Sequence, residues 1–155
     1  MDPGSGAAAL ERALRLLGVR PRGRIELERS LVERGFSPGA AAEALARLDR
    51  QGLLDDLAAA RSAVRLRGVR YGRARVEREL KVRGFSRETM DAAFEAEGGA
   101  DREGEALARL FRKLWKARAD LAPALRRRRV FEALVRRGFS AEKISEIIRG
   151  WYEID

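Results

Sequence analysis

The chain has 155 residues, of which 45% are hydrophobic and 37% are charged, and its formal net charge is +9. A chain of this size and composition can bury a core and form one domain or a short array of repeats. It contains neither cysteine nor histidine, which excludes disulfides, thiolate chemistry and nearly all zinc, haem or iron–sulfur sites. We therefore predict no metal and no cofactor.

The sequence has no apolar stretch near the roughly 20 residues that cross a membrane. Residues 1–6 lack the basic and apolar parts of a signal peptide, and we predict that they form a disordered leader. The absence of cysteine agrees with a reducing cytosol. We expect a cytoplasmic protein without membrane contact.

The positive charge is unevenly spread. Residues 1–60 hold nine basic and nine acidic side chains, so the whole +9 falls in 61–155. Two basic blocks, 61–87 and 109–138, flank an acidic segment, 88–108. This pattern is typical of a protein with an anionic partner, although a solvated helix surface would also explain it. Arginine outnumbers lysine 29 to 4. Codon bias would explain this excess, and so would an interface that needs forked donors for phosphate or carboxylate.

An internal repeat dominates the sequence. The tetrapeptide Arg-Gly-Phe-Ser occurs at 34–37, 83–86 and 137–140, and apolar residues recur five and nine positions on either side of each Phe. Ala and Leu dominate these apolar positions, and their spacing favours helices. The structural joints of the repeat are therefore predicted at Gly35, Phe36, Gly84, Phe85, Gly138 and Phe139.

Each joint is expected to end one helix and start the next. The Gly suits the left-handed residue after a helix, and the following Phe can pack on the Leu five residues earlier. The Ser can cap the next helix by accepting a backbone hydrogen bond. The same Phe precedes this cap, so it can also contact the residue five positions later.

In each repeat we predict a further helix before the two helices that the joint connects. These leading helices cover 7–17, 54–67 and 105–118. The sequence therefore predicts an all-α protein, a tandem array of three three-helix modules, elongated or curved. We expect module one at 7–53, module two at 54–97, a Gly-rich linker at 98–104 and module three at 105–155.

Catalytic motifs are lacking. Asp55 and Asp56 are the only adjacent acidic pair, and capping of a helix explains them. Residues 99–104 have the glycine spacing of a phosphate loop, but Glu105 and Ala106 stand where Lys and Ser or Thr are needed. We predict no catalytic residue and a binding protein rather than an enzyme.

The sequence resembles the RecX family of bacterial recombination regulators over nearly its whole length after the leader. The resemblance combines the threefold Gly-Phe joint, the run 52–56 with Val64, Arg65, Tyr71–Arg73, Arg75, Val76, Glu79 and Leu80, and the closing run 136–144. The family usually has a Phe where this chain has Ala58 and Ala59.

This resemblance implies a negative regulator that binds the RecA filament on single-stranded DNA. Such a protein limits filament growth, ATP hydrolysis, strand exchange and induction of the SOS response. It also implies a DNA-repair role. Beside RecA binding we expect weak direct DNA contact, and we expect a monomer because repeat proteins with charged surfaces are commonly monomeric. We expect contacts to RecA or to DNA phosphate among Arg61, Arg65, Arg67, Arg70, Arg73, Arg75, Arg78, Arg126, Arg129 and Arg136.

Two other functions fit the same residues. The basic blocks would suit a stand-alone, sequence-nonspecific DNA-binding protein, because three-helix units dock on DNA and arginine binds phosphate. A scaffold for another acidic protein would also suit them. The aromatic residues Trp115, Trp151 and Tyr152 fit all three readings, and we interpret them as inter-helix packing.

Overall fold

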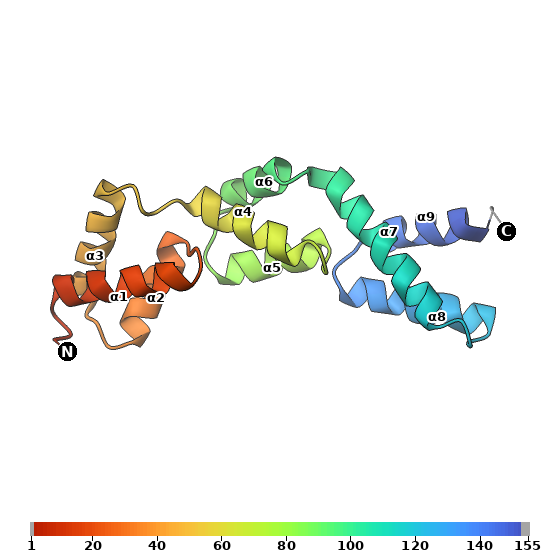
Figure 1. The fold of residues 1–155 in the computed structure, drawn as a ribbon, viewed down its shortest axis with the longest axis horizontal. Coiled ribbons are helices and arrows are strands. Elements are labelled where there is room, and N and C mark those ends of the chain that lie inside the picture. The colour runs from red at the N-terminus through yellow and green to blue at the C-terminus, as the bar shows by residue number, and fades with distance from the viewer. Residues whose placement is uncertain (1, 153–155) are drawn as a thin grey trace. The chain divides into compact units, whose positions relative to one another are not determined.

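The computed structural model describes residues 2–152 and the side chains of residues 2–151. Within this part of the chain there are nine helices and no strand, which confirms the predicted all-α class (Figure 1). Module one consists of α1–α3, module two of α4–α6 and module three of α7–α9. The helices are α1 (Gly6–Val19), α2 (Arg24–Glu33), α3 (Pro38–Arg50), α4 (Asp56–Arg67), α5 (Arg73–Val82), α6 (Arg87–Ala96), α7 (Gly99–Ala117), α8 (Pro123–Arg136) and α9 (Ala141–Tyr152).

The chain folds into two compact units. The first unit holds the described residues up to Ser62 together with Leu80–Ala93. The second holds Ala63–Glu79 together with the described residues from Phe94 onward. The division passes through the three helices of module two, so each unit contains one terminal module and part of the middle one. None of the described helices is long and apolar enough to cross a membrane.

The three joints share one backbone geometry. Their glycines have φ angles of 95°, 95° and 91°, the left-handed conformation that only glycine adopts without strain. The Phe after each glycine donates its backbone N–H to the carbonyl of the Leu five residues earlier, at 3.2, 3.1 and 3.3 Å. Each Ser hydroxyl accepts a bond from the backbone N–H three residues later, at 3.1, 3.1 and 3.2 Å. A single tetrapeptide thus ends one helix and caps the next.

The predicted disordered leader is ordered where the structure describes it. The Ser5 hydroxyl caps α1 by accepting a hydrogen bond from the backbone N–H of Ala8 at 3.1 Å. The carbonyl of Pro3 accepts a hydrogen bond from the backbone N–H of Ser37 at 2.7 Å. Residues 2–5 are therefore tied to module one, which corrects the prediction; Met1 lies outside the described residues.

The predicted linker is largely helical. Gly98 has a φ of 104° and precedes α7, which begins at Gly99. The glycines at 98 and 99 end the preceding chain segment, but residues 100–103 are ordinary helix formers. The Arg102 guanidinium also donates to the carbonyl of Glu97 at 3.1 Å, which supports the first turn. Module three therefore begins six residues earlier than its predicted start, and residues 153–155 at its end lie outside the described part.

Module one has a core of unusually small side chains. Ala9 and Ala13 of α1, and Ala41 and Ala44 of α3, are all fully buried. Small side chains let two helices approach closely, so the alanine-rich sequence of this module is a packing feature. Leu27, Leu31, Phe36, Leu45 and Leu48 complete the same cluster.

Module three has a bulkier core. The predicted apolar stripe of α7 is buried there and includes Phe111 and Trp115, whose rings stack at 5.4 Å between centroids. Trp151 meets Phe111 edge to face at 5.6 Å, although it remains 36% exposed. The contact of Trp151 joins α9 to α7, and Trp115 shares its core cluster with Val130 and Leu134 of α8, so both tryptophans agree with inter-helix packing. The side chain of Tyr152 lies outside the described residues.

Candidate partner-binding surface

Several arginines of the first basic block form ion pairs within the second unit. Arg65 of α4 donates to Glu97 at 2.8 Å. Arg67 binds Glu79 of α5 through two nitrogens, at 2.8 and 2.9 Å. Such forked contacts fix both side chains, because the guanidinium matches both carboxylate oxygens. These arginines therefore have structural partners within the chain.

The pKa values follow from this pairing. Hydrogen bonding to Glu79 raises the pKa of Arg67 above its ordinary value, and this effect exceeds the lowering by burial. The hydrogen bond from Arg67 lowers the pKa of Glu79, and the nearby charge of Arg75 adds to it. Both groups are thus held in their charged forms at neutral pH.

Tyr71 is surrounded by guanidinium groups. Arg75 lies 3.9 Å, Arg67 4.4 Å and Arg137 5.9 Å from the centre of its ring. A ring face attracts cations, so Tyr71 holds these arginines together despite their mutual repulsion. The aromatic ring between α4 and α5 therefore organises the positive charge around it.

Arg126 has a structural role. Its guanidinium donates to the carbonyl of Trp115 at 2.9 and 2.5 Å, and it stacks over the indole ring at 4.1 Å. These contacts join the end of α7 to the start of α8. The charge pattern placed Arg126 among the candidate contact residues, but its guanidinium is held against Trp115.

Four of the predicted arginines point to solvent. Within the described residues, their side chains make no hydrogen bond or ion pair, and all four are exposed: Arg70, Arg78, Arg129 and Arg136. The other two candidates have contacts within the chain. Arg73 binds Glu77 at 2.8 Å and lies 4.5 Å from the ring centre of Phe94, and Arg61 also has an interaction within the chain.

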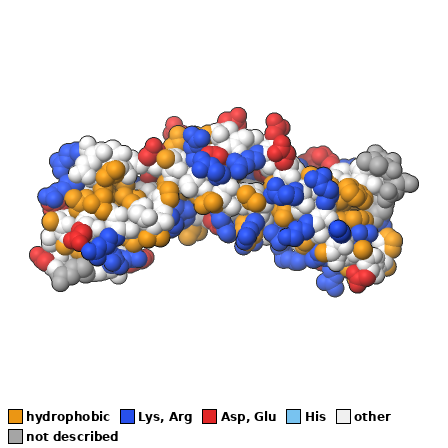
Figure 2. Space-filling view, in the orientation of Figure 1, with side chains coloured by type: hydrophobic (Ala, Val, Ile, Leu, Met, Phe, Trp, Pro, Cys, Tyr) orange, Lys and Arg blue, Asp and Glu red, His pale blue; other side chains and the backbone are white. Residues whose placement is uncertain are grey.

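A basic groove of about 390 Å³ lies between module two and module three within the second unit. Among the described residues, four arginines and no acidic side chain contribute to its wall. Figure 2 shows Lys and Arg side chains gathered over α7 and α8. We call this site the basic groove; its lining residues are Tyr71, Arg75, Leu114, Arg118, Ala133, Arg136 and Arg137.

The sequence reading found two arginines of the basic groove, Arg75 and Arg136, and missed two. Arg118 follows α7 and donates to the carbonyl of Leu114 at 3.3 Å. Arg137 belongs to the third repeat tetrapeptide, whose glycine and phenylalanine drew attention as joint residues. The recurrence of Arg before each joint glycine was the signal that could have identified Arg137.

The groove can bind an anion. Guanidinium groups from three places in the chain converge on it, and a carboxylate or phosphate would meet several charged donors. Three guanidinium groups lie within 6 Å of the centre of the Tyr71 ring, which favours an anionic group over a stacked base. Within the described residues no group of acidic side chains could hold a metal ion.

The helices and the groove together define a protein of three-helix repeats with a basic groove. Two family models match the chain, "RecX, first three-helix domain" over residues 9–48 and "RecX, third three-helix domain" over residues 101–148. The chain belongs to the RecX family of regulatory proteins.

Individual relatives support this assignment. The chain is 36% identical to a regulatory protein RecX of Chlorobaculum tepidum, over 96% of this chain and 91% of that protein. It is 35% identical to a regulatory protein RecX of Xanthomonas axonopodis, over 90% and 85%.

Solved structures share the fold. A crystal structure of RecX from Lactobacillus salivarius matches with a TM-score of 0.79 at 21% identity, over 94% of this chain and 95% of that one. A crystal structure of a regulatory protein RecX matches with a TM-score of 0.78 at 24% identity, over 93% and 71%.

Proposed function

We propose that this protein is a negative regulator of RecA that binds the RecA filament on single-stranded DNA. Binding limits filament growth, ATP hydrolysis, strand exchange and induction of the SOS response. Membership of the RecX family supports the regulatory role. The basic groove is the observation that carries the proposed contact, because it offers four arginines and no lining carboxylate.

The groove and the exposed arginines bind anionic groups of the filament, either RecA carboxylates or DNA phosphates. Arg136 is the most informative residue, since it lines the groove, is exposed, and its side chain makes no hydrogen bond within the part of the chain that the structure describes. Arg70, Arg78 and Arg129 add exposed positive charge to the second unit. No catalytic residue takes part, and the chain acts by binding.

The test measures ATP hydrolysis by RecA on single-stranded DNA, with this protein added well below the RecA concentration. We expect a progressive fall in the rate. Arg136→Glu should require a several-fold higher concentration for the same inhibition, because one close opposite charge is replaced by a like charge. Arg50→Glu is the control: it makes the same charge change at an exposed residue of α3, in the neutral part of the chain.

The alternative function is that of a stand-alone, sequence-nonspecific DNA-binding protein. The exposed arginines favour it, because guanidinium groups bind phosphate without reading bases. Such a protein would bind bare DNA with an affinity that falls linearly in log salt. An unchanged ATPase rate together with salt-sensitive DNA binding would replace the proposed function by this one.

A further inference from the structure

The outer face of α7 carries a row of basic side chains. The row consists of Arg109, Arg112, Lys113 and Lys116, and all four residues are exposed. Residues three, four and seven positions apart lie on one side of a helix, so these four share one face. The apolar stripe of α7 is buried on the opposite side. We call this surface the α7 row.

The α7 row is separate from the basic groove. Leu114 is the residue of α7 that lines the groove, and it packs against the core of module three. It therefore belongs to the apolar stripe, and the groove and the α7 row lie on different sides of the helix. The proposed function uses none of the four residues of the α7 row.

The α7 row has no acidic partner within the chain. The Arg109 guanidinium donates to the backbone carbonyl of Val69 at 2.7 Å. Within the part of the chain that the structure describes, the side chains of Arg112, Lys113 and Lys116 make no hydrogen bond or ion pair. The charged residues of α7 that lie three or four positions from these three are all basic. Like charges at this spacing repel each other and destabilise a helix.

Other helices of the chain avoid this repulsion. In α1, α3, α5, α6 and α8 an arginine forms an ion pair with an acid four residues away, such as Glu43–Arg47 at 3.0 Å and Arg128–Glu132 at 2.9 Å. The helix dipole favours cations in the last turn, which accounts for Lys116 but not for the rest of the α7 row. An anionic partner would relieve the repulsion.

The spacing of the charges indicates the kind of partner. At 1.5 Å per residue, the α7 row extends over about 10 Å, so its four charges follow each other at about 3.5 Å along the helix axis. One strand of DNA carries one negative charge per about 3.4 Å of its axis. Phosphates recur at this interval along any DNA, whereas the acids of a protein surface would have to be placed one by one. The α7 row therefore fits a phosphate backbone.

We propose that the α7 row binds the sugar–phosphate backbone of DNA. The contact is made to phosphate oxygens by lysine and arginine, and it does not depend on the base sequence. This inference goes beyond the proposed function, because it assigns a second surface on the other side of α7 from the basic groove. It holds whichever anionic group the groove binds.

The test measures binding of the full-length protein to fluorescently labelled oligothymidine by anisotropy, over a salt series from about 20 to 200 mM. The test variant combines Lys113→Gln with Lys116→Gln. The control combines Arg50→Gln with Lys81→Gln, which removes the same charge. Both control residues are exposed, lie in the first unit and make no side-chain hydrogen bond or ion pair among the described residues.

We expect the plot of log affinity against log salt to become shallower in the test variant. The slope should fall by about 1.4, because each lost contact to a single-stranded phosphate removes about 0.7. The control should keep the slope of the parent. The test variant should melt at the parent temperature or above it at low salt, since both lysines are exposed and their repulsion is removed.

Three results would overturn the inference. The first is an equal slope for the test variant and the control, and the second is a parent that does not bind the oligonucleotide in this salt range. The third is an unchanged slope with weaker binding to RecA filaments, which would assign the α7 row to carboxylates of RecA. The proposed function is tested separately, by ATP hydrolysis with Arg136→Glu, so either one can fail while the other stands.

Discussion

The backbone N–H of Gly72 donates to the carbonyl of Arg137 at 2.7 Å, so the turn before α5 closes on the joint between α8 and α9. Gly72 is buried and Arg137 is half-buried, and their contact brings Tyr71 and Arg75 beside Arg136 in the basic groove. Residues more than 60 positions apart in the sequence therefore form one site. The groove therefore depends on Gly72, which does not line it and has no side chain that could contact a ligand.

The first prediction concerns this glycine. A Cβ atom at Gly72 would collide with the backbone of Gly138, which cannot move aside as a flexible side chain can. We expect Gly72→Ala to lower the free energy of unfolding by about 1–3 kcal/mol, the usual cost of overpacking. Chemical denaturation measures the change.

Gly104→Ala is the matched control for this substitution. Gly104 lies within α7, and no described atom lies within 4 Å of a Cβ built there. Alanine should stabilise the helix by about 0.5–1 kcal/mol relative to glycine. Equal destabilisation by both substitutions would show that close approach is not the reason for glycine at position 72.

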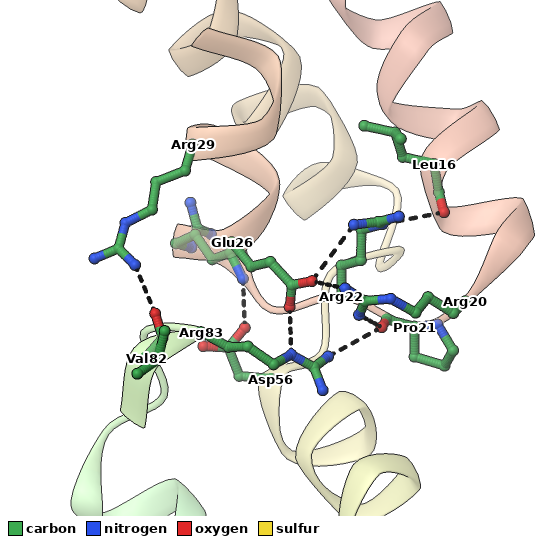
Figure 3. A network of polar contacts seen from close by, with 10 residues as sticks. Leu16, Arg20, Pro21, Arg22, Glu26, Arg29, Asp56, Val82 and Arg83 are labelled. Carbon is green, nitrogen blue, oxygen red and sulfur yellow. Dashed lines mark hydrogen bonds and ion pairs between the residues drawn. The ribbon is translucent and has the colours of Figure 1, made fainter. Parts of the chain in front are cut away.

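The second prediction concerns Glu26, a buried carboxylate of α2 (Figure 3). Burial alone would raise its pKa, but hydrogen bonds from Arg20 and Arg83 outweigh burial and hold the pKa below the ordinary value of 4.5. The unfolded chain then binds the proton more readily than the folded one. The stabilisation by Glu26 is present above pH 4.5 and is lost as the pH falls below it.

Glu26→Gln tests this relation. At pH 7 we expect the free energy of unfolding to fall by about 1–3 kcal/mol, because the arginines lose their charged acceptor. The difference between parent and variant should shrink as the pH is lowered from 5 towards 3. Glu79, whose pKa is also lowered, is present in both proteins, so the difference isolates Glu26. A difference that does not change with pH would contradict the assignment.

The sequence predicted the fold well because its signals were local. In each repeat, the hydrogen bonds of the Phe and of the Ser cap join residues no more than five positions apart, and the left-handed glycine lies between them. Spacing alone could therefore identify these residues. The prediction of a linker at 98–104 failed because it, too, relied on a local signal. Gly98 and Gly99 resembled a break in the chain, but the helix-forming residues after them continue as α7.

The surface was harder to predict, because charge in a sequence does not show which side chains pair. Arg65 and Glu97 lie 32 residues apart and yet form an ion pair at 2.8 Å. Arg126 looked like part of an open basic run, but it binds the carbonyl of Trp115. Only three-dimensional contacts separate these paired arginines from Arg136, whose side chain has no such contact among the described residues.

The third prediction uses this separation. Arg126→Ala removes two hydrogen bonds to the Trp115 carbonyl and the stacking on its ring. We expect the free energy of unfolding to fall by about 1–2 kcal/mol. Arg129→Ala, three residues on and exposed, should change it by less than about 0.5 kcal/mol. Equal effects of the two substitutions, measured by urea denaturation, would remove the structural role of Arg126.

The fourth prediction concerns the serine caps of the joints. The Ser86 hydroxyl accepts the backbone N–H of Thr89 at 3.1 Å, and its loss leaves that donor at the start of α6 without this acceptor. Ser86→Ala should lower the free energy of unfolding by about 1 kcal/mol. Ser86→Asp keeps an acceptor and places a negative charge at the helix N-terminus, so it should retain most of the stability. Thermal unfolding of the two variants measures this difference. Similar losses of stability in Ser86→Ala and Ser86→Asp would mean that Ser86 stabilises the joint by some means other than capping.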